Sequence, residues 1–520
     1  MKCSILCFLL AVSQYGALLP YPNDVKEAKG SFQVTSQTGL VVESQGLAFE
    51  ASCLQQVLQT SFQLTPAIAE RGTIRLRLNP QIRGAEAYRL VVSSKQVVIE
   101  GATAAGVFYG VQTLEQWLWG HEPQVAQGRI PAVTIVDAPA YPYRALMLDP
   151  ARHFLPVEQV QFYIDQMARY KYNTLQLHLT DDQGWRMEIK SHPALTQKAS
   201  DGQFYTQQQL KDLVQYAAQR HVQLIPEMDV PGHTAALLVA YPSLRCEPFL
   251  DSTFVLGQTV NVMLSAADEQ VYQVLDDVIG EMAQIFPSKT LHLGGDESVI
   301  ERNWGESPEN RALMQQLGYT QPRELMQYFF SHVLESVRRH GMKAILWCEL
   351  DNIRMPASEY LFPYPDDVTL VTWRNGLTPK CIELTAAAGH PLILAPGEYC
   401  YLDYPQYKND LPEFLNWGMP ITTLEKTYQL DPTYGLEPAQ RNQIIGVMGT
   451  LWGEAIKDIH RANYMTWPRG LALAEAAWTQ PERRGWDSFK ERMYPNLLQL
   501  MKRGVSFRVP YEVQGSRYQK

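Results

Sequence analysis

The feature that most constrains the fold is a series of eight short apolar runs separated by polar and helical stretches. The runs are 144–148, 174–179, 223–226, 290–293, 344–347, 369–373, 391–395 and 444–451. Two of the intervening helices show clear apolar stripes, at Val160, Ile164, Met167 and at Val271, Leu275, Val278, Met282. We expect the second helix to open with a Ser265-x-x-Asp268 cap. Strands alternating with helices indicate a parallel sheet, and eight such units predict a (β/α)8 TIM barrel.

The 520-residue length exceeds the usual size of one domain, so a smaller domain is expected beside the barrel. Residues 20–140 alternate β-like runs at 39–42, 74–78 and 88–99 with helical stretches, and end in an Ala- and Gly-rich helix at 103–117. We interpret them as an α+β accessory domain with a structural or positioning role, because they contain no cluster of ionisable groups. Residues 141–520 are assigned to the barrel catalytic domain with a C-terminal helical extension.

The first 19 residues have the layout of a secretory signal peptide. Lys2 precedes an apolar run at 3–12, and small residues follow at Ser13, Gly16 and Ala17, so cleavage is expected after Ser13 or Ala17. We therefore expect an exported protein, periplasmic or extracellular and bacterial, and the lack of any Asn-x-Ser/Thr acceptor favours the periplasm. No later segment is apolar for long enough to span a bilayer. The cysteines that remain are scattered, so no disulfide framework or C-x-x-C metal pattern is expected.

Composition describes an ordinary soluble globule. Hydrophobic residues make up 46% and charged residues 19%, and the net charge of -9 gives no support for nucleic-acid binding. The 11 Trp and 27 Tyr residues suit the apolar faces of sugar rings, although a large aromatic core explains them equally well. Nothing in the sequence specifies an oligomeric state.

Polar residues follow each predicted barrel strand. The clusters are Asp149, Arg152 and His153; His178, Asp181 and Asp182; Glu227, Asp229 and His233; Asp296 and Glu297; Trp347 and Glu349; Trp373 and Arg374; Tyr399 to Asp403; and Trp452 and Glu454. In a (β/α)8 barrel the C-terminal strand ends converge on one face, where active sites are built. Each cluster alone has another explanation, since helix caps and solvated loops also carry such residues.

The segment from Leu291 to Ser298 holds the most distinctive chemistry. A short apolar run breaks at Gly294-Gly295 and is followed by two adjacent carboxylates, Asp296 and Glu297. Carboxylates at the end of a buried strand repel each other and lose solvation, so one is expected to hold its proton while the other stays ionised. The alternative is a helix N-cap followed by a first-turn acid.

Tryptophans with Arg and Asp between them predict a pocket for a ligand that is both apolar-faced and hydroxyl-rich, such as a sugar. Acids in a sugar pocket suggest glycoside hydrolysis. Because Asp296 and Glu297 are sequence neighbours, they are poorly placed to flank the scissile bond. One solution makes the 2-acetamido oxygen of the substrate the nucleophile, with Asp296 holding the amide and Glu297 serving as acid and then base.

Two other classes of function remain open from the residues alone. The set His178, Asp181, Asp229, His233 and His292 offers metal ligands, which would suit a metal-dependent amidohydrolase or deacetylase of amino sugars. The paired-His spacing usual at the first strand of such enzymes is absent, which disfavours this reading. A non-catalytic sugar-binding protein is the other alternative, but binding alone would not need Glu297.

Several motifs together resemble glycoside hydrolase family 20, the β-N-acetylhexosaminidases. They are Arg144-x-x-Met-Leu-Asp-x-x-Arg152-His, His178-Leu-Thr-Asp181-Asp-Gln-Gly-Trp185, Pro226-Glu-Met-Asp229-x-Pro-Gly-His233, His292-x-Gly-Gly-Asp296-Glu297, Tyr401-Leu-Asp403 and Trp452-Gly-Glu454. The run from Gly101 to Gly110 similarly resembles the accessory domain of that family. One departure is Trp347-Cys-Glu349, where the family usually has Asp in the middle. We place no chemistry on Cys348.

The resemblance implies an exo-acting, retaining enzyme that releases terminal GlcNAc or GalNAc through an oxazolinium intermediate and needs no metal or cofactor. The implied partner is an N-acetylhexosamine-terminated oligosaccharide or glycoconjugate. Glu297 would be the general acid/base, Asp296 would orient the acetamide, and Tyr401 would donate a hydrogen bond to the acetamide oxygen.

The remaining implied roles concern binding and support. Trp347, Trp373 and Trp452 would enclose the acetamide methyl, and Trp417 would offer a platform for the leaving sugar. Arg152, Asp403 and Glu454 would bind the ring hydroxyls at O3, O4 and O6. Asp181 and His233 would form a supporting pair that reaches Glu297, with Asp229 close to them.

Overall fold

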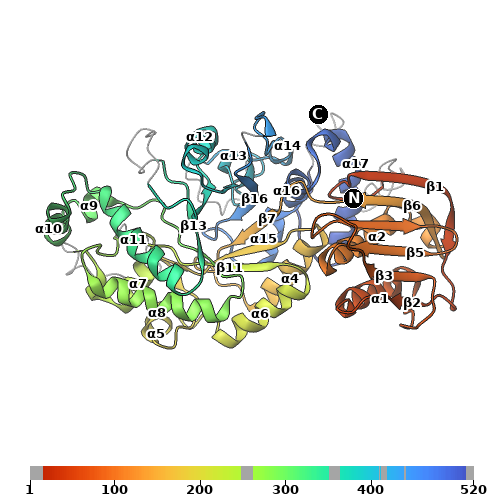
Figure 1. Cartoon of the computed structure of the whole chain (residues 1–520), viewed down its shortest axis with the longest axis horizontal. Coiled ribbons are helices and arrows are strands. Elements are labelled where there is room, and N and C mark those ends of the chain that lie inside the picture. The colour runs from red at the N-terminus through yellow and green to blue at the C-terminus, as the bar shows by residue number, and fades with distance from the viewer. Residues whose placement is uncertain are drawn as a thin grey trace.

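The computed structural model describes residues 16–246, 262–350, 363–408, 410, 419–438 and 441–510. Two units lie side by side along the long axis of the molecule: a smaller sheet-and-helix unit at the N-terminus and a larger barrel (Figure 1). The structure thus confirms the predicted fold class, a (β/α)8 barrel preceded by a smaller α/β unit.

The N-terminal unit is a six-stranded mixed sheet in the order β1-β6-β4-β5-β3-β2. Its elements are β1 (Asp24–Gln33), β2 (Leu40–Val42), α1 (Ala48–Phe62), β3 (Ile74–Leu78), β4 (Tyr88–Val92), β5 (Val97–Gly101), α2 (Ala104–Trp119), α3 (Glu122–Val125) and β6 (Arg129–Asp137). The run predicted as one strand at 88–99 is two antiparallel strands, β4 and β5, because Ser93 to Gln96 form a turn closed by a backbone hydrogen bond. The accessory unit is therefore a hairpin-containing sheet.

Helix α2 lies between this sheet and the barrel. Its residues from Gly106 to Leu118 are all buried, as expected for a helix that is covered on both sides. One side packs on β4 and β5, and the other side reaches the barrel, where Gln116 Nε2 donates to the carbonyl of Arg169. The small residue Gly106 allows this packing, since a Cβ there would lie 2.3 Å from the carbonyl oxygen of Ala87. The helix joins the two units into one packed body.

The barrel is closed by eight parallel strands in the order β11-β12-β13-β14-β15-β16-β7-β8. They are β7 (Tyr143–Leu148), β8 (Thr174–His178), β11 (Gln223–Glu227), β12 (Thr290–His292), β13 (Lys343–Trp347), β14 (Thr369–Thr372), β15 (Leu392–Leu394) and β16 (Ile444–Leu451). All eight strands lie where the apolar runs predict them. Closure comes from β16 pairing with β7, the last strand with the first.

Helices surround the strands on the outside of the barrel (Figure 1). The larger ones are α4 (Val157–Arg169), α6 (Gln207–Gln219), α8 (Glu269–Ile285), α10 (Pro308–Leu317), α11 (Glu324–Arg339), α12 (Thr378–Ala388), α15 (Ile459–Thr466), α16 (Arg469–Trp478) and α17 (Trp486–Lys502). Shorter elements are β9 (Thr180–Asp181), β10 (Gly184–Trp185), α5 (Ala194–Ala199), α7 (Ala235–Ala240), α9 (Ile300–Asn303), α13 (Gly397–Cys400) and α14 (Leu424–Tyr428).

The cap of α8 differs from the prediction. Asp268, not Ser265, is the N-cap residue, and its side chain accepts a hydrogen bond from the backbone N–H of Gln270. Ser265 instead accepts from the N–H of Ala267 in the preceding turn. An Asp closer to the first turn satisfies the free N–H groups directly, so the helix begins one residue after it, at Glu269.

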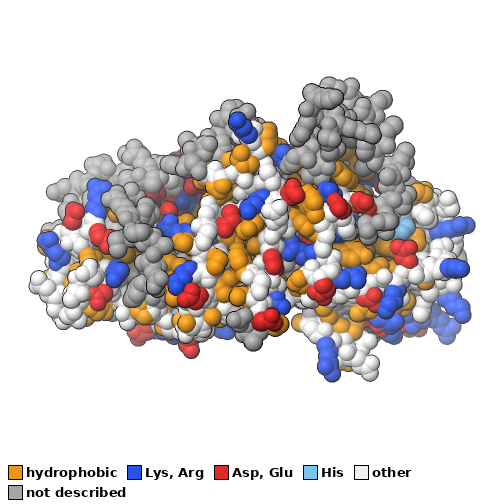
Figure 2. All heavy atoms as spheres, turned by 90° about the horizontal axis from the view of Figure 1, so that it is seen from above, with side chains coloured by type: hydrophobic (Ala, Val, Ile, Leu, Met, Phe, Trp, Pro, Cys, Tyr) orange, Lys and Arg blue, Asp and Glu red, His pale blue; other side chains and the backbone are white. Residues whose placement is uncertain are grey.

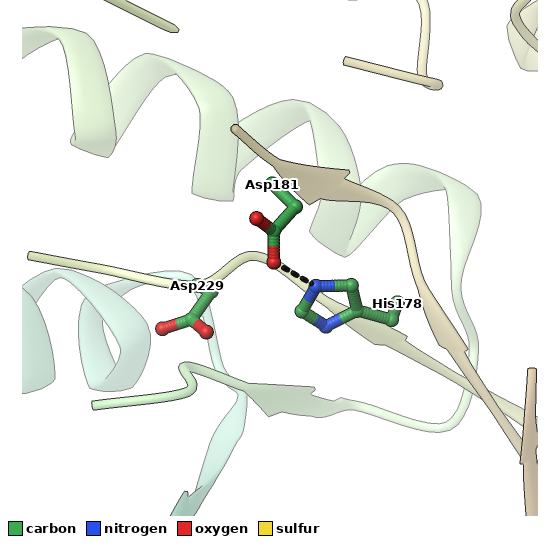
Figure 3. A group of neighbouring side chains, drawn as sticks. All are labelled: His178, Asp181 and Asp229. Atoms are coloured by element: carbon green, nitrogen blue, oxygen red, sulfur yellow. Dashed lines mark hydrogen bonds and ion pairs between the residues drawn. The ribbon is translucent and has the colours of Figure 1, made fainter. Parts of the chain in front are cut away.

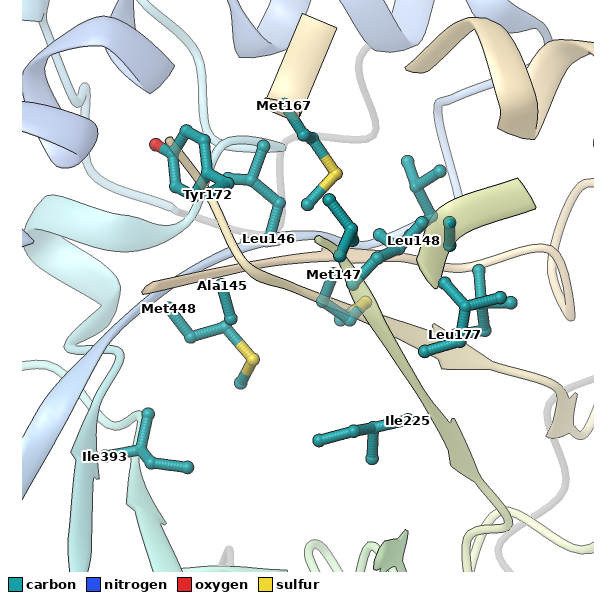
Figure 4. Close-up of a cluster of buried hydrophobic side chains, with 14 of the residues drawn as sticks. Ala145, Leu146, Met147, Leu148, Met167, Tyr172, Leu177, Ile225, Ile393 and Met448 are labelled. Carbon is teal, nitrogen blue, oxygen red and sulfur yellow. The ribbon is translucent and has the colours of Figure 1, made fainter. Parts of the chain in front are cut away.

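Apolar side chains of the barrel strands pack against apolar side chains of the surrounding helices. Figure 4 shows Leu146 and Leu148 of β7, Leu177 of β8 and Ile225 of β11 gathered with Met167 of α4. Every residue of β8 is buried, as expected for parallel strands covered on both faces. On the surface, Figure 2 shows acidic and basic side chains mixed over the barrel part of one face, in keeping with the modest net charge.

Buried charges join the N-terminal unit to the barrel. Asp137 Oδ2, at the end of β6, accepts from the Tyr88 hydroxyl at 2.6 Å and from Trp478 Nε1 at 2.9 Å, and it lies 3.3 Å from Lys171 Nζ. Arg144, fully buried at the start of β7, forms an ion pair with Glu86 at 2.6 Å. These contacts fix the two units relative to each other.

Candidate active site

Parallel register brings the C-terminal ends of all eight strands to one end of the barrel, which we call the mouth. His178 at the end of β8 pairs in register with Glu227 at the end of β11, and Glu227 pairs with His292 of β12. The predicted strand-end clusters in the described residues therefore follow neighbouring strands at the same edge. Trp417 lies outside the described residues, so its predicted role stays a prediction.

The turn after β12 presents the two adjacent acids. Gly294 and Gly295 both have a left-handed backbone, with φ of 64° and 91°, and a Cβ on Gly294 would lie 1.8 Å from Asp229 Oδ1. Asp229 Oδ1 also accepts a hydrogen bond from the N–H of Gly295 at 3.0 Å. Asp229 therefore holds the turn that carries Asp296 and Glu297, and glycine is needed where its carboxylate approaches the backbone.

Glu297 itself has a left-handed backbone, with φ of 50°, which is uncommon for a residue with a side chain. Burial and then the charge of Asp296 raise the pKa of the Glu297 carboxyl above its ordinary value. Its side chain keeps 38% exposure, so a ligand in the mouth can reach it. An accessible carboxyl whose raised pKa lets it keep a proton to higher pH is suited to general acid chemistry.

His233 lies between the acids and Asp181. Its Nε2 lies 3.7 Å from Glu297 Oε2 and 3.9 Å from Asp296 Oδ2, and its Nδ1 lies 3.4 Å from Asp181 Oδ1. Burial would lower the pKa of His233, but the carboxylate of Asp181 outweighs this and holds it well above its usual value. The imidazole is therefore a cation beside the two acids.

Asp181 collects three positive groups. Its Oδ2 lies 2.8 Å from both Arg152 Nη2 and His178 Nε2, and its Oδ1 faces His233. Burial would raise the pKa of this carboxyl, but Arg152 and His233 keep it well below its usual range. Asp181 therefore stays ionised, and it links the arginine side of the mouth to the acid pair through His233.

Aromatic side chains form one wall of the mouth. The rings of Trp347 and Trp452 lie 5.7 Å apart, and Tyr401 lies 6.4 Å from Trp452. Burial raises the pKa of the Tyr401 hydroxyl well above its usual value, so it remains a hydrogen-bond donor. Trp373 is only partly buried, with Arg374 4.1 Å above its ring. The structure thus brings Trp347, Trp452 and Tyr401 together.

Two acids that influence each other, Glu454 and Asp403, lie on another side of the mouth. Glu454 Oε1 is 3.9 Å from Arg152 Nη2. Asp403 is buried, its Oδ1 has no hydrogen-bond partner, and burial and then Glu454 raise the pKa of its carboxyl well above the usual range. Buried polar atoms without a partner are rare, and here they indicate bonding capacity available to a polar ligand.

Two residues to which the sequence pattern assigned no role form an ion pair at the mouth. Arg374 Nη2 lies 3.2 Å from Glu349 Oε2, and Arg374 also exerts its charge on Glu297. Burial raises the pKa of Glu349 well above its usual value against the opposing effect of Arg374. Their positions after β13 and β14 were the only sequence signal that could have identified them.

Side chains with metal-ligand spacing also occur at the mouth. His178, Asp181 and Asp229 have ligand atoms within 4.8 Å of one another, and Figure 3 shows His178 and Asp181 turned toward each other with Asp229 beside them. His178 Nε2 and Asp181 Oδ2 already contact each other at 2.8 Å. A metal ion would have to break that contact and the ion pair of Asp181 with Arg152.

A barrel whose mouth gathers paired acids, an arginine and neighbouring aromatic rings defines an enzyme of the glycoside hydrolase class. Comparison with known families agrees. Residues 141–481 match the glycosyl hydrolase family 20 catalytic domain, and residues 16–138 match domain 2 of the same family.

Relatives and solved structures point the same way. The chain is 36% identical over 432 residues to a beta-hexosaminidase of Akkermansia muciniphila, covering 80% of this chain and 84% of that protein. It is 33% identical over 480 residues to a beta-hexosaminidase of Vibrio furnissii, covering 88% and 76%. A GH20 exo beta-N-acetylglucosaminidase from Vibrio harveyi, in complex with N-acetylglucosamine, superposes with a TM-score of 0.85 at 32% identity, covering 96% and 79%. The Streptomyces plicatus N-acetyl-beta-hexosaminidase superposes with a TM-score of 0.80 at 30% identity, covering 96% and 97%.

The chain belongs to glycosyl hydrolase family 20. Its activity is that of a β-N-acetylhexosaminidase. Within the part of the chain that the structure describes, no helix has both the length and the apolar character needed to cross a membrane.

Proposed function

We propose that this enzyme is an exo-acting, retaining β-N-acetylhexosaminidase in which the 2-acetamido oxygen of the substrate is the nucleophile. The observation that carries the proposal is the placement of both acids beside one nitrogen. Asp296 Oδ2 and Glu297 Oε2 lie 3.9 and 3.7 Å from His233 Nε2, so they stand next to each other on one side of the mouth. A retaining enzyme with a protein nucleophile instead needs its two carboxyl groups on opposite sides of the glycosidic bond.

In the first step Glu297 gives its proton to the departing glycosidic oxygen while the acetamide oxygen attacks the anomeric carbon. The bond to the leaving sugar breaks, and an oxazolinium ion forms with its positive charge near Asp296. Tyr401 donates its hydroxyl to the acetamide oxygen, and its raised pKa keeps the proton in place for that role. The rings of Trp347 and Trp452, tilted against each other, offer an apolar enclosure for the acetamide methyl.

In the second step the Glu297 carboxylate takes a proton from water, and that water attacks the anomeric carbon. Ring opening restores the acetamide, so the product sugar keeps its β configuration and Glu297 is again protonated. Arg152, Glu454 and Asp403 would bind the hydroxyls of the terminal sugar. Asp403 is buried with a free acceptor atom, which supports a closed end to the pocket and removal of one terminal residue at a time.

The test compares aryl glycosides whose 2-acetamido group carries zero, one, two or three fluorine atoms. Fluorine withdraws electrons from the amide oxygen, so kcat/KM should fall steeply along the series if that oxygen attacks. Proton NMR of the first product should show the β anomer. A flat series or an α product would exclude the acetamide nucleophile.

One observation favours a second candidate, a metal-dependent amidohydrolase of amino sugars: the spacing of His178, Asp181 and Asp229. Acetate released from N-acetylglucosamine, and its loss on treatment with EDTA, would support that activity. Release of the aryl group unaffected by EDTA supports the glycosidase instead.

We also propose that the protein is exported and that its signal peptide is cleaved after Ser13. Ala17, Leu18 and Leu19 are buried, the carbonyl of Ala17 accepts from Asn496 Nδ2, and that of Leu18 accepts from Arg492 Nη1. Cleavage after Ala17 would remove one of these contacts and leave a charged amino terminus beside the other. Mass spectrometry of the mature N-terminus tests the site, and a chain beginning at Leu18 would contradict it.

A further inference from the structure

A carboxylate that the proposed mechanism does not use lies beneath the aromatic wall. Glu227, the last residue of β11, is fully buried. Its Oε2 accepts from Gln176 Nε2 at 2.8 Å and lies 2.8 Å from His178 Nδ1. Its Oε1 accepts from Trp347 Nε1 at 3.0 Å and lies 3.0 Å from His292 Nδ1. Partners from three other barrel strands, β8, β12 and β13, therefore meet on one side chain.

The geometry indicates that Glu227 and the histidines around it form a charged layer inside the barrel. Both ring nitrogens of His178 lie 2.8 Å from a carboxylate oxygen, Nδ1 from Glu227 and Nε2 from Asp181, so the ring is suited to carry two protons. Burial alone would lower the pKa of His178, but Glu227 and Asp149 outweigh it and hold the pKa well above its usual value. Burial would likewise raise the pKa of Glu227, and His178 and His292 hold it well below. An ionised pair inside a barrel is tolerated only where opposite charges and hydrogen-bond donors lie this close.

One arm of this layer reaches the aromatic wall. Trp347 is held by its indole N–H on Glu227, while its ring lies 4.7 Å from His292 and 5.7 Å from Trp452. Trp452 in turn lies edge-on to His178 at 5.1 Å. Glu227 thus fixes the rotation of the ring that faces the acetamide in the proposed mechanism.

The other arm reaches the acid/base. His178 contacts Asp181, Asp181 contacts His233, and His233 lies 3.7 Å from Glu297. The further charged groups that face this arm are Asp149, Arg152, Asp182, Asp229, His233 and Asp296. Glu227 acts directly on two of the groups in this arm: it raises the pKa of His178, with which it is in contact, and it adds to the raised pKa of Asp229.

We propose that Glu227 is a positioning residue that holds the aromatic wall through Trp347 and the acid/base arm through His178 and Asp181, so that both act as one unit. This role rests on the proposed function, and it concerns a side chain that touches no substrate. A carboxylate that contacted only the aromatic wall would serve packing alone. One that contacted only His178 would serve proton placement alone. Its position between both arms is what ties acetamide binding to the charge state of the mouth.

The two arms can be separated by two variants. Glu227→Gln keeps an acceptor for Trp347 and removes the largest cause of the raised pKa of His178, so that pKa falls while the ring can still donate Nε2–H to Asp181. We expect kcat to fall about tenfold or more, which is the loss typical when a side chain that supports a functional residue is changed. With less positive charge beside it, Asp181 takes up a proton more readily, so the acid limb of the kcat profile should move to higher pH.

Trp347→Phe keeps an aromatic ring and removes only the N–H that Glu227 accepts. We expect KM for an aryl 2-acetamido-β-glucoside to rise several-fold with the pH profile unchanged. In the double variant the losses in kcat/KM should be less than multiplicative, because both changes disable the same unit.

Glu475→Gln is the matched control. Glu475 is also fully buried and paired, with Arg492 at 2.6 Å and the Tyr428 hydroxyl at 3.1 Å, but it lies on α16 away from the mouth. It should lower the unfolding temperature without moving the pH profile. If Glu227→Gln behaves in the same way, with kcat and the acid limb unchanged in folded protein, Glu227 only packs the core and the proposal is overturned. The acid limb is readable with any substrate that is turned over, so this outcome is independent of the fluorinated series.

Discussion

The network around Asp137 and the side chains at the mouth are both buried, but they differ in whether they leave polar atoms without a hydrogen-bond partner. At the end that meets the N-terminal unit, Asp137 contacts Lys171, Tyr88 and Trp478. At the mouth, buried polar atoms without a hydrogen-bond partner include Arg152 Nε, Asp296 Oδ1, Glu349 Oε1, Trp373 Nε1 and Asp403 Oδ1. Closed networks stabilise a structure, whereas open ones retain bonding capacity for a ligand.

The backbone shows the same difference. Lys171 and His221, at the interdomain end, have positive φ because they follow the C-caps of α4 and α6, a position where a left-handed residue ends a helix. His233 and Glu297, at the mouth, have positive φ of 52° and 50° and follow no helix. Backbone strain that does not serve to end a helix is typical of residues whose side chains must point in one direction for function.

The largest effect is expected at Glu297. Glu297→Gln should lower kcat/KM for aryl 2-acetamido-β-glucosides about a thousandfold or more, which corresponds to about 4 kcal/mol of lost transition-state stabilisation. The amide cannot give a proton to the leaving oxygen, but it occupies the same space. The unfolding temperature should stay close to that of the unchanged protein, and a variant with more than a tenth of the original rate would contradict the assignment.

The next effect belongs to the interdomain end. Asp137→Ala leaves Lys171 buried without its anion, and such a loss typically costs about 3 to 5 kcal/mol of unfolding free energy. Urea unfolding followed by circular dichroism measures it, while kcat per folded molecule should not change. Asp24→Ala removes an exposed ion pair with Lys26 and should cost less than about 0.5 kcal/mol. If the two variants lost the same unfolding free energy, the buried network around Asp137 would be no more stabilising than an exposed ion pair.

At the mouth, Asp296→Asn should alter both rate and pH dependence. The pKa of Glu297 is raised by burial and then by Asp296, so a neutral side chain removes the second cause and the pKa falls. Glu297 then loses its proton at lower pH, and the basic limb of the kcat profile moves to lower pH, with a roughly hundredfold loss of kcat at the optimum. Asp277→Asn, on the exposed face of α8, is the control. A basic limb that stays in place would contradict the proposed effect of Asp296.

A smaller effect tests how far the charges of the mouth also stabilise the fold. Asp181 has a pKa well below its unfolded value, so its ionisation contributes stability that is present above about pH 4 and is lost as pH falls through the folded pKa. Near neutral pH the unfolding free energy of the unchanged protein should therefore exceed that of Asp181→Asn by about 1.5 to 3 kcal/mol. This difference should shrink on acidification. Thermal unfolding across a pH series measures this. A gap that widens at low pH would mean that the carboxylate is not ionised in the folded protein.

Most of the barrel could be predicted from the sequence, because each strand is a continuous apolar run that can be recognised without knowing its neighbours. The strand-end clusters follow too, since a parallel barrel leaves only one face for them. The cap of α8 was wrongly predicted, because Ser265 and Asp268 both suit a cap and only the position of the first turn decides between them.

Other features depend on contacts that no local pattern records. Glu227 takes its partners from β8, β12 and β13, so its role is visible only once those strands are neighbours. The same is true of Glu349 with Arg374 and of Asp137 with Trp478, which are joined across long stretches of chain. Distances within the mouth had to come from the structure for this reason.

Closure of the barrel by β16 on β7 has a consequence for how the protein is made. A ribosome delivers β7 early and β16 late, and the contacts of Leu18 and Ala17 with Arg492 and Asn496 come later still. Until β16 has been synthesised, the growing chain therefore keeps one edge of β7 unpaired, which is a site where other chains can add strands. Cells that produce this enzyme are expected to need holding chaperones over that interval.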